Sequence, residues 1–238
     1  MSKTTTPRPP PTNRLLAALP KDEYERLLLK LEPFTLVFGE VIYDPGDLIR
    51  NVYFPTSGII SLLAAVEDRA TLEVGIVGRE GMVGLPAFME VKTSANRAVV
   101  QGAGAAMKMK VSAFRKECEN GGSLSRLLRR YSHSRLTQIA QGAACNRFHP
   151  IDARLARWLL MTRDRMGTDE FRLTQEFLSN MLGVRREGVT KAAGALQAEK
   201  LISYSRGNLL ILDRVGLKAV ACHCYGIIKA EYDTFFPK

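Results

Sequence analysis

The sequence has few of the residues that form disulfides and metal centres. Its 238 residues include only four cysteines and three histidines. No apolar run approaches the roughly 20 residues that a bilayer-spanning helix needs. The cysteines show no disulfide framework; they are Cys118, Cys145, Cys222 and Cys224. We therefore expect a protein of the reducing cytoplasm without disulfide bonds.

The scarcity of histidine also argues against a metal-dependent enzyme. A cupin-type site needs histidines clustered on strands, but His133, His149 and His223 all lie outside the β-rich residues 33–110. The sequence has neither a glycine-rich phosphate loop nor a nucleophile elbow. We therefore expect no catalytic residues, no bound metal and no other cofactor, and we predict that the protein is not an enzyme.

Positive charge is abundant, and it is confined to one half of the chain. The formal net charge is +10. Residues 1–122 hold 15 Lys and Arg against 14 Asp and Glu, whereas residues 123–238 hold 19 against 10. A merely solvated basic surface would not explain this segregation. The distribution indicates a polyanionic partner for the C-terminal half.

The N-terminal half has the sequence pattern of a β domain. Residues 1–12 are polar and proline-rich, which predicts a disordered tail rather than a signal peptide. Residues 13–31 predict a helix that is interrupted at Pro20. Between residues 33 and 110, runs rich in Val, Ile, Phe and Leu are separated by turn residues, which is typical of an all-β barrel or jelly roll.

A long amphipathic helix is predicted from Ser123 to about Ala144. Its apolar residues recur at spacings of three and four; they are Leu124, Leu127, Leu128, Tyr131, Leu136 and Ile139. Such a stripe can pack on a second copy of the helix or only on the β domain. Residues 146–150 then indicate a hinge, and residues 151–167 indicate another helix, with Trp158 in the core.

Residues 173–200 predict two short helices joined by a tight turn. Thr174 suits the N-cap of the first helix, and Gly183 can adopt the positive φ that ends it. The inward face of the second helix is small and apolar; it consists of Val189, Ala192, Ala193 and Leu196. Residues 201–213 read as two strands with a turn. Together these elements predict a winged helix-turn-helix.

The polar face of the second helix carries groups that suit base edges. Arg and Lys match guanine O6 and N7, Glu matches the cytosine amino group, and this part of a helix-turn-helix enters the major groove. We predict base contacts from Arg186, Glu187 and Lys191, and phosphate contacts from Arg185 and Arg206. The whole predicted DNA-binding set is Arg185, Arg186, Glu187, Thr190, Lys191, Gln197 and Arg206.

These residues resemble the DNA-binding domain of the Crp/Fnr family of bacterial transcription regulators, whose second helix begins Gly-x-x-Arg-Glu-x-x-x-Arg. The matching positions are Gly183, Arg186, Glu187 and Lys191. Lys at the last position keeps the charge but not the bidentate geometry of Arg. GEVIYDPGD and VYFPTSGIISLL resemble the family's cyclic-nucleotide-binding β-roll.

The resemblance implies an α+β fold with three ordered parts after the tail of residues 1–12. These are a β-roll or jelly-roll sensor domain over 13–122, a dimerisation helix over 123–146 and a winged helix-turn-helix over 147–238. It implies a sequence-specific DNA-binding transcription regulator that responds to an effector. The implied partners are double-stranded DNA, a second copy of the chain and RNA polymerase, with no membrane.

The resemblance weakens at the nucleotide cassette. Family members that bind cyclic nucleotides use Gly-Glu-x-Gly and an Arg before Ser or Thr. The matching turn is Gly81-Met82-Val83-Gly84, and Arg97 is displaced by one residue. We therefore expect neither cAMP nor cGMP to bind in the usual mode. The candidate effector pocket is Gly81, Met82, Val83, Gly84 and Arg97. An apolar pocket, or plain core, is the alternative for Met82, Leu85, Met107 and Met109.

Two further functions stay open on the sequence alone. One is a cyclic-nucleotide-binding module whose output is contact with another protein. The other is a redox or metal sensor that uses Cys222, His223 and Cys224, which Cys145 and His149 can join. Three adjacent positions on a helix point in different directions, so we expect these cysteines to be buried structural thiols.

Overall fold

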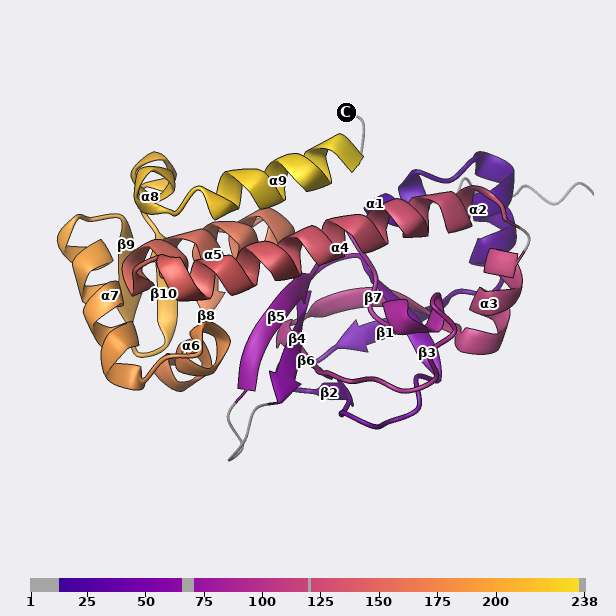
Figure 1. Ribbon diagram of the computed structural model, residues 1–238, viewed down its shortest axis with the longest axis horizontal. Helices are drawn as coiled ribbons and strands as arrows, with labels where there is room; N and C mark the ends of the chain where they lie inside the picture. The colour runs from indigo at the N-terminus through magenta and orange to yellow at the C-terminus, as the bar shows by residue number, and fades with distance from the viewer. Residues whose placement is uncertain (1–12, 66–70, 120, 236–238) are drawn as a thin grey trace, which may run out of the picture.

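The computed structural model describes residues 13–65, 71–119 and 121–235, organised along one long helix, α4 (Ser123–Phe148). Figure 1 shows a β-rich domain against one side of α4 and a smaller helical domain at its C-terminal end. This arrangement confirms the predicted α+β class. Within the described ranges, no helix combines the length and apolar character needed to cross a bilayer. The predicted tail, residues 1–12, lies outside the described residues.

The β-rich domain consists of two antiparallel sheets. One has the order β1 (Glu32–Leu36), β7 (Gly104–Lys110), β3 (Asn51–Pro55). The other sheet has the order β2 (Val41–Tyr43), β6 (Arg97–Gly102), β4 (Ile59–Ala65), β5 (Thr71–Val77). Strands β3 and β4 are buried along most of their length, because other elements cover both of their faces. The predicted β-roll is therefore confirmed.

Short helices close the right-hand end of the β-roll in Figure 1. They are α1 (Arg14–Ala17), α2 (Lys21–Leu28) and α3 (Val111–Glu119). Pro20 forms the break that the sequence predicts. The buried side chain of Asn13 caps α1 and donates hydrogen bonds to the carbonyls of Pro55 (2.9 Å) and Gly81 (2.8 Å). The N-terminal segment is thereby fixed to the sensor domain.

Helix α4 differs from its predicted form at both ends. The carboxylate of Glu23 on α2 accepts the N–H of Ser123 at 3.1 Å, so a distant residue rather than Ser123 caps the helix. The helix continues to Phe148, which makes most of the predicted hinge at 146–150 helical. Only His149 and Pro150 separate it from α5 (Ile151–Met166).

The apolar stripe of α4 divides into two faces. Leu124, Leu128 and Tyr131 are buried against the β-roll and its flanking helices. Leu136 and Ile139 remain 63% and 43% exposed. The apolar residues of α4 therefore form two separate surfaces. The rest of this chain covers the first and leaves the second exposed.

The C-terminal domain is the predicted winged helix-turn-helix with one additional strand. It contains α6 (Gln175–Leu182), α7 (Arg186–Ala198), β9 (Ile202–Ser205) and β10 (Asn208–Ile211). Strand β8 (Glu170–Arg172), which the sequence did not predict, pairs with β10. Trp158 of α5 is buried in the core, as predicted.

The sequence of residues 213–238 predicts one last helix, and this prediction is wrong. The chain forms α8 (Arg214–Val220) and α9 (Cys224–Phe235), with a non-helical linker at 221–223. Figure 1 shows α9 turning back to lie along α4. Tyr232 of α9 donates a hydrogen bond to Gln138 of α4 at 3.0 Å. The end of the chain therefore ties the C-terminal domain to the long helix.

Candidate functional site

The helix-turn-helix forms for the local reasons that the sequence indicates. The Thr174 hydroxyl accepts the N–H of Phe177 at 3.1 Å, which caps α6. Gly183 ends α6 with φ of 61°, a conformation that residues with a Cβ rarely adopt. The inner face of α7 is buried and holds the helix against the domain core; it includes Val189, Ala192 and Leu196.

The polar face of α7 is open to solvent. Arg185, Arg186, Glu187, Thr190 and Lys191 are all exposed. Arg186 forms an exposed ion pair with Glu176 of α6 at 2.6 Å, and the two side chains are 61% and 67% exposed. An exposed pair of this kind is worth at most about 1 kcal/mol, so it can open when Arg186 binds another anion or a base edge.

The wing and the end of α7 have different roles. Arg206 and Gly207 connect β9 to β10, and both have positive φ, at 50° and 82°, which matches a tight two-residue hairpin turn. Arg206 is exposed at this tip. The side chain of Gln197 instead accepts the backbone N–H of Tyr204 at 2.7 Å. Gln197 therefore anchors the wing, which leaves it less available for a base.

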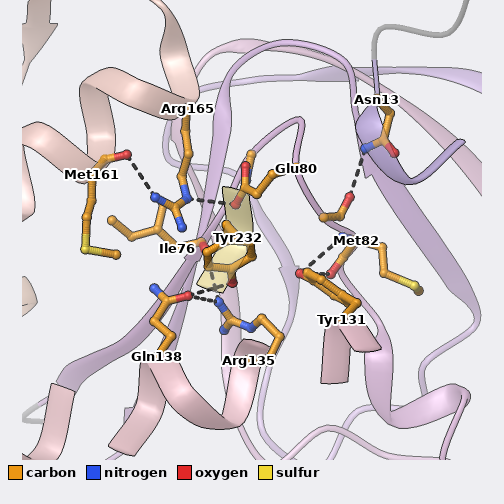
Figure 2. Close-up of polar contacts among 12 residues, drawn as sticks. Asn13, Ile76, Glu80, Met82, Tyr131, Arg135, Gln138, Met161, Arg165 and Tyr232 are labelled. Atoms are coloured by element: carbon orange, nitrogen blue, oxygen red, sulfur yellow. Dashed lines mark hydrogen bonds and ion pairs between the residues drawn. The ribbon is translucent and has the colours of Figure 1, made fainter. Parts of the chain in front are cut away.

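The backbone donors of the turn that would hold a cyclic phosphate already have acceptors. The N–H of Gly81 donates to the carbonyl of Gly78 at 3.1 Å, and that of Val83 donates to the carbonyl of Tyr53 at 2.8 Å. The N–H of Met82 donates to the Tyr131 hydroxyl at 3.2 Å, and that hydroxyl donates to the Met82 carbonyl, also at 3.2 Å. Figure 2 shows the Tyr131 ring beside this turn.

Tyrosines occupy the space around the turn. A Cβ at Gly81 would lie 2.2 Å from the Tyr131 oxygen, so only glycine permits this approach. Burial raises the pKa of Tyr43 to about 12, against the effect of hydrogen bonds from Ser94 and the Gly84 backbone. Burial likewise raises the pKa of Tyr131. Both phenols are therefore neutral donors and acceptors at physiological pH.

The remaining predicted pocket residues lie in the core or at the surface. Arg97 forms an ion pair with Asp44 at the surface. Met82 and Met109 are each 1% exposed within the main core, and Leu85 and Met107 pack against that core. These four residues therefore serve as core, which was the alternative interpretation.

Glu80, next to the turn, links the two domains. Its carboxylate accepts a hydrogen bond from Arg165 Nε of α5 at 2.7 Å, and both side chains are less than a tenth exposed. Arg165 also donates to the Met161 carbonyl at 3.0 Å and lies over the Tyr232 ring at 5.3 Å. Figure 2 shows this group converging from the sensor turn, α5 and α9. Sequence reasoning missed the pair because the two residues are far apart in the chain.

A second contact between the domains involves β5. Trp158 Nε1 donates to Glu73 Oε1 at 2.9 Å, and Ser61 donates to Glu73 Oε2 at 2.7 Å. Burial of the carboxyl raises the pKa of Glu73, although these two hydrogen bonds favour its charged form. The same strand contacts α6. The helix-turn-helix is therefore packed directly on the sensor domain.

The late cysteines gather at the C-terminal end of α4. Cys145, His149, Cys222 and Cys224 place their ligand atoms within 4.8 Å of one another. The expectation that neighbouring cysteines diverge is wrong for Cys222 and Cys224, because the linker between α8 and α9 is not helical. His223 is outside this group. Its ring packs edge-on against the His149 ring, with 5.0 Å between the ring centroids.

A β-roll joined through a long helix to an exposed helix-turn-helix defines a two-domain DNA-binding regulator. Residues 35–120 match the cyclic nucleotide-binding domain family, and residues 153–220 match the Crp-like helix-turn-helix domain family. With both domains in this order, the chain belongs to the Crp/Fnr family of transcription regulators. No curated protein matches it in sequence.

Solved structures share the whole architecture. FixK2 from Bradyrhizobium japonicum is 16% identical, with a TM-score of 0.69 over 81% of this chain and 98% of its own. A Crp/Fnr regulator from Eubacterium rectale is 18% identical, with a TM-score of 0.68 over 88% and 98%. The c-di-GMP responsive regulator CLP from Xanthomonas campestris is 19% identical, with a TM-score of 0.64 over 82% and 100%. At these identities, the similarity establishes a shared fold.

Proposed function

We propose that this regulator acts as a homodimer whose two α7 helices enter successive major grooves of one pseudo-palindromic DNA site. The observation that carries the proposal is the exposed polar face of α7, from which Glu187 and Lys191, and Arg186 once its exposed pair with Glu176 opens, can reach base edges. Arg206 at the wing tip adds a phosphate contact, and the charge excess of residues 123–238 attracts the duplex.

Selection of bound duplexes from a random pool tests this proposal. We expect the enriched sequences to be palindromic, with half-sites about one DNA turn, roughly 34 Å, apart. The affinity should fall steeply with salt, because phosphate contacts release counterions. Equal recovery of all sequences at low salt would show that α7 reads no bases.

The uncovered face of α4 supplies the dimer contact in this proposal. Leu136, Ile139, Ala140 and Ala143 are exposed and share one side of the helix at spacings of three and four. Burying the exposed part of the two large side chains against a second copy stabilises the dimer by at most roughly 1.5–3 kcal/mol per side chain. A two-fold symmetric dimer of this kind matches the symmetry of a palindromic site.

The double substitution Leu136→Glu/Ile139→Glu should convert the dimer to a monomer. Two carboxylates facing their copies would be desolvated and would repel one another. Light scattering after size exclusion measures the mass directly. Arg126→Glu, at an exposed position nearer the start of α4, is the control and should leave the dimer intact. A dimeric double variant would place the interface elsewhere.

The sensor domain, in this proposal, responds to something other than a cyclic nucleotide. Each backbone N–H from Gly81 to Gly84 already has an acceptor: a backbone carbonyl for Gly81 and Val83, Tyr131 for Met82, and Tyr43 for Gly84. A cyclic phosphate would have to displace both tyrosines to reach the N–H groups of Met82 and Gly84. We expect calorimetric titration with cAMP or cGMP to give no saturable heat. Saturable binding in the micromolar range would require the two tyrosines to move and would overturn this part of the proposal.

The proposed location and the proposed action on RNA polymerase follow from the class of regulator. We infer that the protein works in the cytoplasm, where its DNA and RNA polymerase are found, and that its action on RNA polymerase is regulatory rather than catalytic. The contacts of Glu80 with Arg165 and of Glu73 with Trp158 support direct coupling between sensor and DNA-binding domain. An effector changes DNA affinity only by favouring one arrangement of these domains over another.

A further inference from the structure

Four metal-ligand side chains meet at the joint between α4 and the DNA-binding domain. Cys145 and His149 lie one helical turn apart, at the end of α4 and just beyond it. Cys222 and Cys224 come from the α8–α9 linker and the start of α9. Cys145 and Cys224 are 0% and 1% exposed, and Cys222 is 8% exposed. The four side chains, which we name the Cys₃His cluster, therefore form a closed, largely buried group.

The distances fit one tetrahedral ion. Zn–S bonds of about 2.3 Å and Zn–N bonds of about 2.0–2.1 Å imply S–S separations of about 3.8 Å and S–N separations of about 3.6 Å. Cys145 Sγ lies 3.4 Å from Cys222 Sγ, and Cys224 Sγ lies 3.6 Å from His149 Nδ1. All four ligand atoms lie within 4.8 Å of one another. Little movement is needed to bind an ion at their centre.

The electrostatic surroundings point to the same occupant. Three thiolates, one neutral imidazole and a divalent ion carry a net charge of −1. Arg157 of α5 is buried and lies within electrostatic range of all three thiols. Among the described residues, its Nε has no hydrogen-bond partner, and neither has Nε of Arg154. An anionic metal centre would add negative charge beside Arg157, whose nearest other acidic group in electrostatic range is the Glu73 carboxyl.

We propose that the Cys₃His cluster binds one zinc ion, or a divalent ion of the same borderline-soft class, as a structural tie. Four protein ligands fill a tetrahedral shell and leave no open position for a reacting group, which is typical of structural zinc. The ion would join the end of α4 to the α8–α9 linker. It would thereby fix the DNA-binding domain relative to α4, the helix that carries the proposed dimer contact.

Metal analysis of the full-length protein, purified without chelator, tests the site. We expect about one zinc per chain in the unaltered protein, and less than about a tenth of that in Cys145→Ser and Cys222→Ser. Cys118→Ser is the matched control, because Cys118 lies outside the cluster, and it should keep its zinc. His149→Ala provides a variant that keeps every thiol yet should lose most of the metal.

Two measurements on the unaltered protein keep the test independent of whether the variants fold. Removal of zinc by a chelator should lower Tm by roughly 5–10 °C relative to protein with zinc 100-fold above its Kd, and re-addition should restore it. Replacement by Co²⁺ should give the visible bands of a tetrahedral thiolate site. Failure to bind Zn²⁺ or Co²⁺ would overturn the proposal. So would a Cys145–Cys222 disulfide, or iron with acid-labile sulfide, in the freshly isolated protein.

Discussion

Arg186→Ala/Lys191→Ala should abolish sequence-specific DNA binding while the protein remains folded. Each side chain is placed to make a base contact worth about 1–3 kcal/mol, so the double substitution is expected to weaken binding to the selected site by about 2–6 kcal/mol. This corresponds to a loss of at least about thirtyfold. Binding to unrelated duplexes should fall much less, because phosphate contacts from Arg185 and Arg206 remain.

The stability of the double variant distinguishes loss of recognition from loss of fold. Both side chains are exposed, and the Arg186–Glu176 pair contributes at most about 1 kcal/mol. Denaturant unfolding should therefore change little. Lys218→Ala removes a charge from an exposed position on α8 and should leave the base preference unaltered. If the double variant retained both affinity and base preference, α7 would not be the recognition helix.

Arg165→Met should strongly destabilise the folded protein. It leaves the buried Glu80 carboxylate without its ion-pair partner, and such a loss costs about 3–5 kcal/mol. The pair spans the sensor turn and α5, so we also expect looser packing between the two domains. Unfolding in denaturant measures the first effect, and amide hydrogen exchange in α5 and β5 measures the second.

Comparison with a variant that lacks both charges separates the ion pair from general packing. Glu80→Leu/Arg165→Met removes both charges, so it should be more stable than Arg165→Met alone. Arg163→Met is the control on the same helix, because its pair with Asp169 is partly exposed and should be worth at most about 1 kcal/mol. Equal stability of Arg163→Met and Arg165→Met would mean that the buried pair contributes no more to stability than the partly exposed one.

The helix-turn-helix could be predicted because its signals are local. The cap at Thr174, the positive φ at Gly183 and the small apolar face of α7 each depend on residues within a few positions of one another. The turn spacing of residues 33–110 likewise predicted the β-roll, although not the order of its strands. The same local reasoning missed β8, since a three-residue strand has no pattern of its own until β10 pairs with it.

The errors arose where a distant residue decides the local structure. Glu23 caps α4 from α2, about 100 residues earlier in the chain, and the linker at 221–223 interrupts what the sequence predicted as one helix. That interruption brings Cys222 and Cys224 to the same side. Each case depends on a neighbour that the order of residues does not show.

The sequence by itself determined most elements of this protein, its segregated charge and the chemistry that α7 presents, because periodicity, caps and composition act over short stretches of chain. Only the tertiary structure decided that tyrosines occupy the sensor turn, that Glu80 meets Arg165, and that three cysteines and a histidine converge at the end of α4. In each case the segments that meet are many tens of residues apart in the chain, and packing of buried surfaces against one another brings their side chains together.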